Sequence, residues 1–274
     1  MNSTQLHVGG WNILLDVKHG DKVPPQAQRL EALAYTIETA QQRVGRRFDY
    51  LGILEAQKTE DGQNGDVLAA HLGYEPGVWH PHSRIKSGEH LGLIGTQVCE
   101  ADFMNLPTGK MAAMAWAGSV LFTATHFRFQ LKGKERSMQA AGLMEQIGDV
   151  ERGVLFLDPN CLAWQEPRRI IEAAGYRSVF ELTGRAPIRT ALTNKTYRRA
   201  MLSIPERLAS GRGLWVDDIY VKGLDVLDAY ALEGESDHSL VGALIDTGDL
   251  QEANSASSCT DRLNLVQHSN VRAE

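Results

Sequence analysis

The chain has 274 residues, of which 43% are hydrophobic and 23% charged, and it carries a formal net charge of −6. This length allows one large domain or two small ones with a sizeable buried core. The acidic balance excludes a polycationic nucleic-acid binder, so an anionic partner has to be held by a local basic patch or through a metal. No apolar run approaches a membrane span, and no basic segment precedes a long apolar core near the N-terminus. We therefore expect neither a secretory signal nor a membrane partner.

The three cysteines, Cys99, Cys161 and Cys259, are odd in number and lack the spacing of metal ligands. They predict neither a disulfide framework nor a zinc site. Reduced thiols fit this usage, so we expect a cytoplasmic protein.

Apolar periodicity predicts strands that alternate with helices. Residues 5–15 read as a strand with Asn12 inside it, and residues 49–55 as a short strand that ends on Glu55. Between them lies an amphipathic helix of roughly twenty residues. After a short helix over 66–72, residues 75–128 read as strands and turns, with strands over 91–98, 111–116 and 119–126.

The second half continues this alternation. A helix over 135–147 leads into the strand Val154–Leu157, whose four apolar residues in a row indicate burial on both faces. Another helix covers 164–174, and three strands close the fold over 214–221, 227–232 and 240–245. We predict one domain over 1–246, followed by a polar, flexible tail over 247–274.

Polar side chains stand at the ends of several apolar strands. Pro159 stops the Val154–Leu157 strand, so Asp158 and Asn160 are expected at the rim of the sheet, where sites form in layered α/β domains. Taken singly, these residues also have structural explanations, such as an Asx-type turn or a structural histidine. Their coincidence in one chain favours a site, whose candidate members are Asn12, Glu55, His126, Asp158, Asn160, Asp217, Asp237 and His238.

The segment 168–212 differs in charge from the rest of the chain. It holds ten basic and three acidic residues, a balance of +7 within a chain of −6. Such a segment is either a solvated arginine-rich region or a phosphate-binding one, because the guanidinium fork matches phosphate oxygens. The candidate substrate-binding residues are Arg185, Arg189, Arg198 and Arg199.

The candidate residues lie in short motifs whose order and spacing are those of a known family. These motifs are Trp11-Asn12-Ile13, Leu54-Glu55, Thr125-His126-Phe127, Arg136 with Gln139, Asp158-Pro159-Asn160, Val216-Asp217-Asp218-Ile219-Tyr220 and Ser236-Asp237-His238. Over residues 5–246 the chain resembles the endonuclease/exonuclease/phosphatase superfamily, which is built like deoxyribonuclease I. The resemblance implies a monomer and an α/β fold: a four-layer sandwich of two mixed, largely antiparallel sheets packed face to face, with helices outside.

The resemblance also implies a metal site and a water-activating residue. A divalent cation neutralises the negative charge of a phosphate ester and needs only a few carboxylate oxygens. Glu55 would be the main Mg²⁺ or Mn²⁺ ligand, with Asn12 beside it and Asp237 as a further ligand. Asp158 would orient or deprotonate the attacking water.

Further roles concern the phosphate. Asn160 and His126 would donate hydrogen bonds to its oxygens. His238 would contact the phosphate or transfer a proton, and Asp217 would fix the tautomer of that histidine. The family allows either the aspartate of the water site or the histidine to act as the base.

Two departures from the family pattern stand beside the site. Leu157 replaces the usual glycine before Asp158, and its bulk is expected beside the metal site, where it could shift the turn. Asp218 takes the place of an aromatic residue, so register assigns the family's aspartate to Asp217 and keeps Asp218 as the alternative.

We therefore expect a divalent-metal-dependent phosphoesterase that hydrolyses phosphodiester bonds, in nucleic acid or a nucleotide-linked phosphate, by in-line attack of an activated water. An alternative on the same fold is a phosphatase or phospholipase-like hydrolase of inositol phosphates or sphingolipid headgroups. A non-catalytic binding module is disfavoured, because all the charged motif residues are present.

Overall fold

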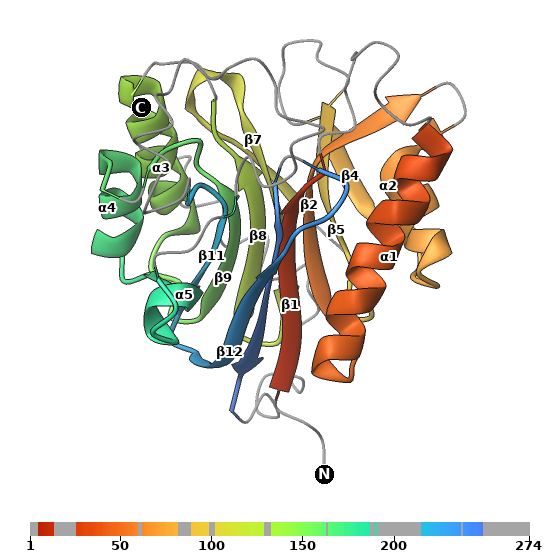
Figure 1. Cartoon of the computed structure of the whole chain (residues 1–274). Helices are drawn as coiled ribbons and strands as arrows, with labels where there is room; N and C mark the ends of the chain where they lie inside the picture. The colour runs from red at the N-terminus through yellow and green to blue at the C-terminus, as the bar shows by residue number, and fades with distance from the viewer. Residues whose placement is uncertain are drawn as a thin grey trace, which may run out of the picture.

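A computed structural model of the chain describes residues 5–13, 26–59, 62–81, 89–98, 102–128, 133–162, 164–186, 190, 215–236 and 238–248. Two β-sheets pack face to face, and helices cover the outer side of each (Figure 1). Both sheets are mixed, because each contains one parallel strand pair among antiparallel ones. The predicted four-layer α/β sandwich is confirmed.

The first sheet has the strand order β12-β13-β1-β2-β5-β4, with β3 paired to β2. Its central pair, β1 and β2, is parallel, and β13 lies antiparallel on the other side of β1. Helices α1 (Gln26–Val44) and α2 (Asn64–His71) cover its outer face. The strands are β1 (Gln5–Asn12), β2 (Tyr50–Thr59), β3 (Gly62–Gln63), β4 (Val78–Pro81), β5 (Glu89–Ile94), β12 (Asp225–Leu232) and β13 (Leu240–Asp246).

The second sheet has the order β10-β11-β9-β8-β7-β6, and its parallel pair is β8 with β9. Helices α3 (Gly133–Ile147) and α4 (Glu166–Ala173) lie on its outer side, and the short α5 (Val179–Leu182) follows β10. A 3-10 turn, η1 (Pro107–Gly109), precedes β7. The strands are β6 (Asp102–Asn105), β7 (Met111–Ala117), β8 (Val120–His126), β9 (Gly153–Asp158), β10 (Arg177–Ser178) and β11 (Asp218–Lys222).

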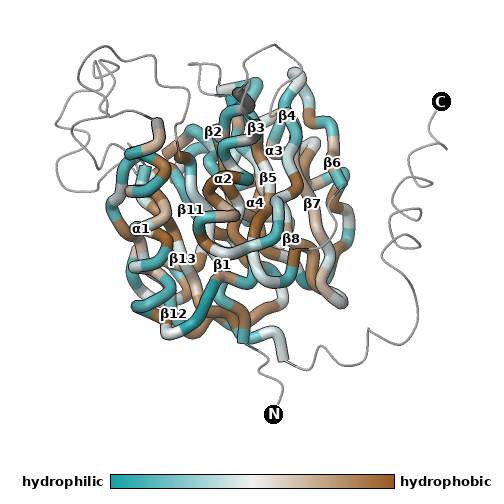
Figure 2. Tube along the Cα trace, turned by 90° about the vertical axis from the view of Figure 1, so that its right-hand side faces the viewer, coloured by the Kyte–Doolittle hydropathy of each residue, from teal (hydrophilic) through white to brown (hydrophobic). Residues whose placement is uncertain are grey.

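Strand β9 is buried on both faces, as its apolar run predicts. Phe156 faces the first sheet, whereas Leu155 and Leu157 face α3 and α4. Phe156 packs on Gly10 of β1 and Gly52 of β2, where an added Cβ would lie 3.3 Å and 2.7 Å from its side chain. The two glycines therefore let the sheets approach each other closely. In Figure 2 hydrophobic residues run along the central strands, and α1 alternates between hydrophilic and hydrophobic stretches.

The predicted elements are present with shifted boundaries. β2 continues past Glu55 to Thr59, because the chain resumes pairing with β5 after an irregularity between Ile53 and Ala56. Pairing of the predicted 214–221 strand begins only at Asp218. The predicted tail lies almost wholly outside the described residues, which end at 248, so it stays a prediction. Among the described helices, none is long and apolar enough to cross a membrane.

The Gly52–Phe156 contact predicts a cost for any side chain at position 52. Gly52→Ala forces a Cβ into the Phe156 ring, so we expect the free energy of unfolding to fall by about 1–3 kcal/mol. Urea unfolding measures this change. The control is Gly133→Ala at the start of α3, where an added Cβ meets no described atom within 4 Å, so the change should stay below about 1 kcal/mol. Equal stability of the two variants would contradict the close approach.

A buried histidine on β1 predicts a loss of stability in acid. The Tyr230 hydroxyl lies 2.6 Å from Nε2 of His7, and the Arg46 carbonyl lies 3.1 Å from Nδ1. Burial lowers the pKa of His7 from 6.5 to about 4, so between these values the unfolded chain binds a proton that the native chain does not. Stability is full above pH 6.5 and falls toward pH 4, by up to about 3 kcal/mol from this group.

Urea unfolding at pH 7 and at pH 4.5 tests this dependence. His7→Gln should show a smaller difference between the two pH values than the wild type does. The exposed His71 on α2 supplies the control, because His71→Gln should keep the wild-type difference. If His7→Gln shows the same difference in stability between pH 7 and pH 4.5 as the wild type, then groups other than His7 cause the loss of stability in acid.

Candidate active site

The predicted site residues that the structure describes meet at one edge of the sandwich. The parallel pairs bring the carboxyl ends of β1, β2, β8 and β9 to this edge, and the antiparallel strands β11 and β13 begin there. In the β8–β9 register His126 lies directly beside Asp158. The residues gathered in this way are Asn12, Glu55, His126, Asp158, Asn160, Asp217 and His238.

Asp158 is completely buried at the end of β9. One carboxylate oxygen, Oδ2, accepts a hydrogen bond from Asn12 Nδ2 at 3.1 Å. The other, Oδ1, accepts the backbone N–H of Asn160 at 2.9 Å, which closes an Asx-type turn. The Asx-type turn expected for Asp158 is thus present. The turn fixes the carboxylate, which also contacts Asn12 of the polar cluster.

Leu157 does not crowd this carboxylate. Side chains alternate along a strand, so Leu157 points away from Asp158 and packs with Leu143 of α3 and Ile171 of α4. The expectation of bulk beside the metal site is therefore wrong. A side chain at this position fills the layer between the sheet and its helices.

His126 is oriented by Asn160. The Asn160 Nδ2 donates to the Phe127 carbonyl at 2.8 Å and lies 2.6 Å from His126 Nε2. Because an amide nitrogen only donates, Nε2 accepts and the proton of a neutral ring sits on Nδ1. That nitrogen lies 3.5 Å from Glu55 Oε1. Both amide donors of Asn160 are used within the protein, so donation to a phosphate would require exchange of one of them.

Glu55 stands at the irregularity of β2 in a left-handed backbone conformation, with a φ of 55°. Such a conformation is uncommon for a residue other than glycine and is typical of functional positions. Burial, followed by the nearby charge of Glu89, raises the pKa of Glu55 to about 7, against the lowering effects of His238 and Asn12. Because burial and a neighbouring negative charge disfavour the ionised carboxylate, a nearby cation would stabilise it.

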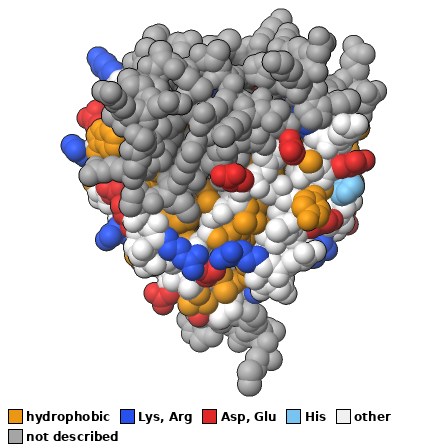
Figure 3. Space-filling model, in the orientation of Figure 1, with side chains coloured by type: hydrophobic (Ala, Val, Ile, Leu, Met, Phe, Trp, Pro, Cys, Tyr) orange, Lys and Arg blue, Asp and Glu red, His pale blue; other side chains and the backbone are white. Residues whose placement is uncertain are grey.

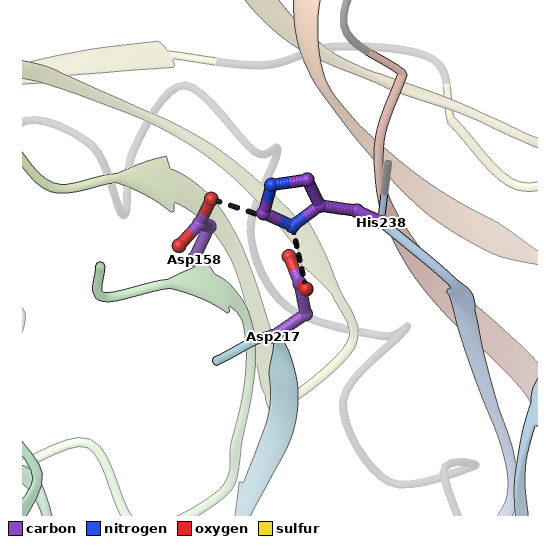
Figure 4. Close-up of side chains that lie close together, drawn as sticks. All are labelled: Asp158, Asp217 and His238. Atoms are coloured by element: carbon purple, nitrogen blue, oxygen red, sulfur yellow. Dashed lines mark hydrogen bonds and ion pairs between the residues drawn. The ribbon is translucent and has the colours of Figure 1, made fainter. Parts of the chain in front are cut away.

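His238 and Asp217 form a close pair, shown in Figure 4. Nδ1 of His238 lies 2.7 Å from Asp217 Oδ2 and 3.9 Å from Asp158 Oδ2. The backbone around His238 is tied to the start of the chain: Trp11 Nε1 donates to the His238 carbonyl, and the Ser236 hydroxyl donates to the Asn12 carbonyl. The serine of the Ser-Asp-His motif therefore joins the site to β1.

Asp218 faces away from this pair. Its carboxylate is buried on the outer side of the second sheet, 3.0 Å from Arg168 Nη1. Asp217 is thus the residue that contacts His238, in agreement with the register assignment. Arg168 belonged to the segment with the balance of +7, and its burial removes it from any phosphate-binding surface.

The predicted substrate-binding arginines are only partly described. Arg185 forms an ion pair of 2.6 Å with Asp228 and donates to the Ala229 carbonyl, both on β12. Arg189, Arg198 and Arg199, like Asp237, lie outside the described residues. In the described part of the face shown in Figure 3, basic, acidic and hydrophobic side chains are interspersed, with one short row of basic ones.

Three further residues near the site, Glu89, Lys110 and Thr190, are not among those that the sequence predicts. Glu89 is the first residue of β5, so a carboxylate shortly before an apolar run is the signal that could have indicated it. Lys110 precedes β7; burial lowers its pKa to about 8, and Glu89, Glu55 and Asp158 oppose that shift. Thr190 accepts the backbone N–H groups of Val216 and Asp217, and nothing in its sequence surroundings indicated this.

The donors at this edge fit a divalent cation. Repulsion from Glu89 and Asp158 contributes to the raised pKa of Glu55, and a bound cation would relieve it. Ligand atoms of Asp158, Asp217 and His238 also lie within 4.8 Å of one another. Because most of these donors are carboxylate oxygens, the chemistry suits Mg²⁺ or Mn²⁺ better than a thiolate-loving metal.

Solved structures share this architecture. An endonuclease/exonuclease/phosphatase family protein from Bacteroides thetaiotaomicron is 17% identical, with a TM-score of 0.62 over 88% of this chain and 97% of that one. The human Nocturnin catalytic domain with bound sulfate anion is 17% identical, with a TM-score of 0.64 over 89% and 94%. A mannosyl-6-phosphatase from Bacteroides thetaiotaomicron is 17% identical, with a TM-score of 0.61 over 88% and 99%.

Neither the protein-family models nor the curated proteins give a match to the sequence, so the likeness lies in the structure. The matches span nearly the whole of both chains, and two of their descriptions name a hydrolase family or a phosphatase. The motif residues Asn12, His126 and Asp158 lie at the ends of the parallel strands of this architecture. The chain has the fold of the endonuclease/exonuclease/phosphatase superfamily, as its motifs indicate.

Proposed function

We propose that the protein is a divalent-metal-dependent phosphoesterase that hydrolyses phosphodiester bonds. The observation that supports this most is the placement of His238 between two buried aspartates, 2.7 Å from Asp217 and 3.9 Å from Asp158, beside the strained Glu55. Buried carboxylates are costly, and their grouping around a histidine is typical of acid–base chemistry. The fold is shared with nucleases and phosphatases.

In the proposed reaction Asp158 orients or deprotonates the attacking water. Asn12 and the Asx-type turn hold its two oxygens, so the carboxylate is preorganised for this task. Asp217 accepts from His238 Nδ1, and we assign to Nε2 the contact with the phosphate or the transfer of a proton. His126, whose tautomer Asn160 sets, supplies an Nδ1 proton within the carboxylate cluster.

Glu55 and Asn12 would hold the metal, together with Asp237. When bound, the cation supplies positive charge that offsets the phosphate and stabilises the transition state. Asn12 donates Nδ2 to Asp158, so its Oδ1 is the atom that suits a cation.

Nucleic acid or a nucleotide-linked phosphate is the proposed substrate class, supported by the basic residues of segment 168–212 other than the buried Arg168 and the paired Arg185. The alternative is a phosphatase acting on phosphorylated small molecules, and one similar structure is a mannosyl-6-phosphatase. A panel of DNA, RNA, aryl phosphodiester and sugar phosphate under one metal condition separates these classes. Preferential turnover of the monoester would favour the alternative.

Substitutions at Asp158 and His238 test the catalytic assignment. Asp158→Asn and His238→Gln keep the side-chain size but remove the proton-transfer groups, so kcat should fall by about 10²–10⁴ with Mg²⁺ present. Asp225→Asn on β12 is the control, because it changes an exposed carboxylate in the same way and should keep kcat. Wild-type turnover in both site variants would refute the assignment.

Metal removal tests the cofactor. EDTA should abolish hydrolysis, and excess Mg²⁺ or Mn²⁺ should restore it. Glu55→Gln removes the charge of the main ligand, so we expect about ten-fold or greater weakening of metal binding by calorimetry. Full activity in EDTA would contradict a metal-dependent reaction.

A further inference from the structure

Arg168 lies almost completely buried on α4, beneath the segment that leads into β11. Burial by itself lowers the pKa of an arginine, but Tyr220 and Asp218 raise the pKa of Arg168 above its usual value, so the guanidinium is charged. A buried charge has to be matched by acceptors. The acceptors for Arg168 lie on the segment from 215 to 217, which carries Asp217, and on β11 directly after it.

The guanidinium contacts four groups on this segment and on β11. Nη1 donates to Asp218 Oδ2 at 3.0 Å and to the Tyr220 hydroxyl at 2.6 Å. Nη2 donates to the carbonyls of Trp215 and Val216 at 3.1 Å and 2.7 Å. The group also lies 4.9 Å from the centre of the Trp215 ring. A planar fork with several donors can make these contacts together, and a single ammonium group cannot.

The segment from 215 to 217 precedes the sheet pairing, which begins at Asp218. It therefore has no ladder hydrogen bonds to fix it. Arg168 holds its carbonyls from one side, and Thr190 Oγ1 accepts the Val216 and Asp217 N–H groups at 3.0 Å and 2.9 Å. The Thr190 carbonyl accepts the Ser239 N–H at 2.7 Å, next to His238. These contacts link the backbones of both members of the Asp217–His238 pair.

We infer that Arg168 is a positioning residue, which holds the 215–217 backbone so that Asp217 stays in hydrogen-bonding distance of His238. Arg168 does not reach the cluster itself; it acts through Asp217. The inference rests on the proposed phosphoesterase function for its kinetic consequence. It also explains the departure at Asp218: an acid replaces the usual aromatic residue because it provides the counter-charge for this guanidinium.

The main test variant removes the contacts between Arg168 and the 215–217 backbone without leaving a buried charge. Arg168→Met combined with Asp218→Leu replaces both partners by apolar side chains, an exchange that folded proteins tolerate. The expected result is a folded protein whose kcat falls about ten-fold to a hundred-fold while KM stays within about two-fold, because geometry is lost and substrate contacts are not. A folded pair variant with kcat within about two-fold of wild type would overturn the inference.

A measurement that does not depend on activity follows His238 directly. The Nδ1 proton of His238 gives a downfield NMR signal when it is held by Asp217, and its loss in His238→Gln assigns it. In the pair variant this signal should broaden or move upfield. An unchanged signal would overturn the inference. If the wild type hydrolyses no phosphate ester, the proposed function fails, and this signal still decides the positioning role.

Two further variants complete the test. Arg168→Lys keeps the charge beside Asp218 but loses most of the carbonyl contacts, so it decides the matter if the pair variant does not fold. If Arg168→Lys lowers kcat and shifts the His238 signal, the positioning role of Arg168 is supported. If both values are unchanged, the inference is overturned. The matched control is Arg46→Met, which removes an arginine that bonds the Gln5 carbonyl and Asp49.

Arg46 lies near the opposite end of β1 from Asn12. The Arg46→Met variant should lose stability and keep both kcat and the His238 signal. An equal fall of kcat in this control would assign the effect to general destabilisation and overturn the inference.

Discussion

The site depends on the direction in which four strands run. Because β1 is parallel to β2 and β8 is parallel to β9, their carboxyl ends reach the same edge of the sandwich. Antiparallel pairing then makes β11 and β13 start at that edge. Asn12, His126 and Asp158 end strands, and Asp217 and His238 precede them. Strand direction, set by hydrogen bonding, thus determines which polar groups can meet.

Burial of ionisable groups costs free energy unless each group has partners. Each ionisable side chain in the cluster has defined partners: Asp158 has Asn12 and an Asx-type turn, and His238 has Asp217. Burial and the nearby charge of Glu89 raise the pKa of Glu55. On the outer side of the second sheet the buried charges of Arg168 and Asp218 are matched by each other in an ion pair. One buried cluster groups carboxylates that suit a cation, and the other pairs its carboxylate with a guanidinium of the chain itself.

Much of this arrangement could be predicted from the sequence, because strand ends are local features. The apolar run that stops at Asp158 and the Ser-Asp-His motif both identify an edge residue. What could not be predicted depends on contacts distant in sequence. The direction of Leu157, the use of both Asn160 donors by His126 and Phe127, and the partner of Asp218 follow only from packing. The burial of Arg168 could not be predicted either, because the charge balance of segment 168–212 does not show which of its arginines is buried.

The position of β13 has a consequence for how the chain folds during synthesis. Among the described strands β13 comes last in the chain, and it lies between β12 and β1, so one edge of β1 stays unpaired until β13 has been made. Pairing across such sequence distances is slow, and exposed strand edges favour association with other chains. The Trp11–His238 and Ser236–Asn12 contacts likewise join residues that are far apart in the sequence. Closure of the first sheet and placement of His238 beside Asp217 therefore both depend on the segment that leads into β13.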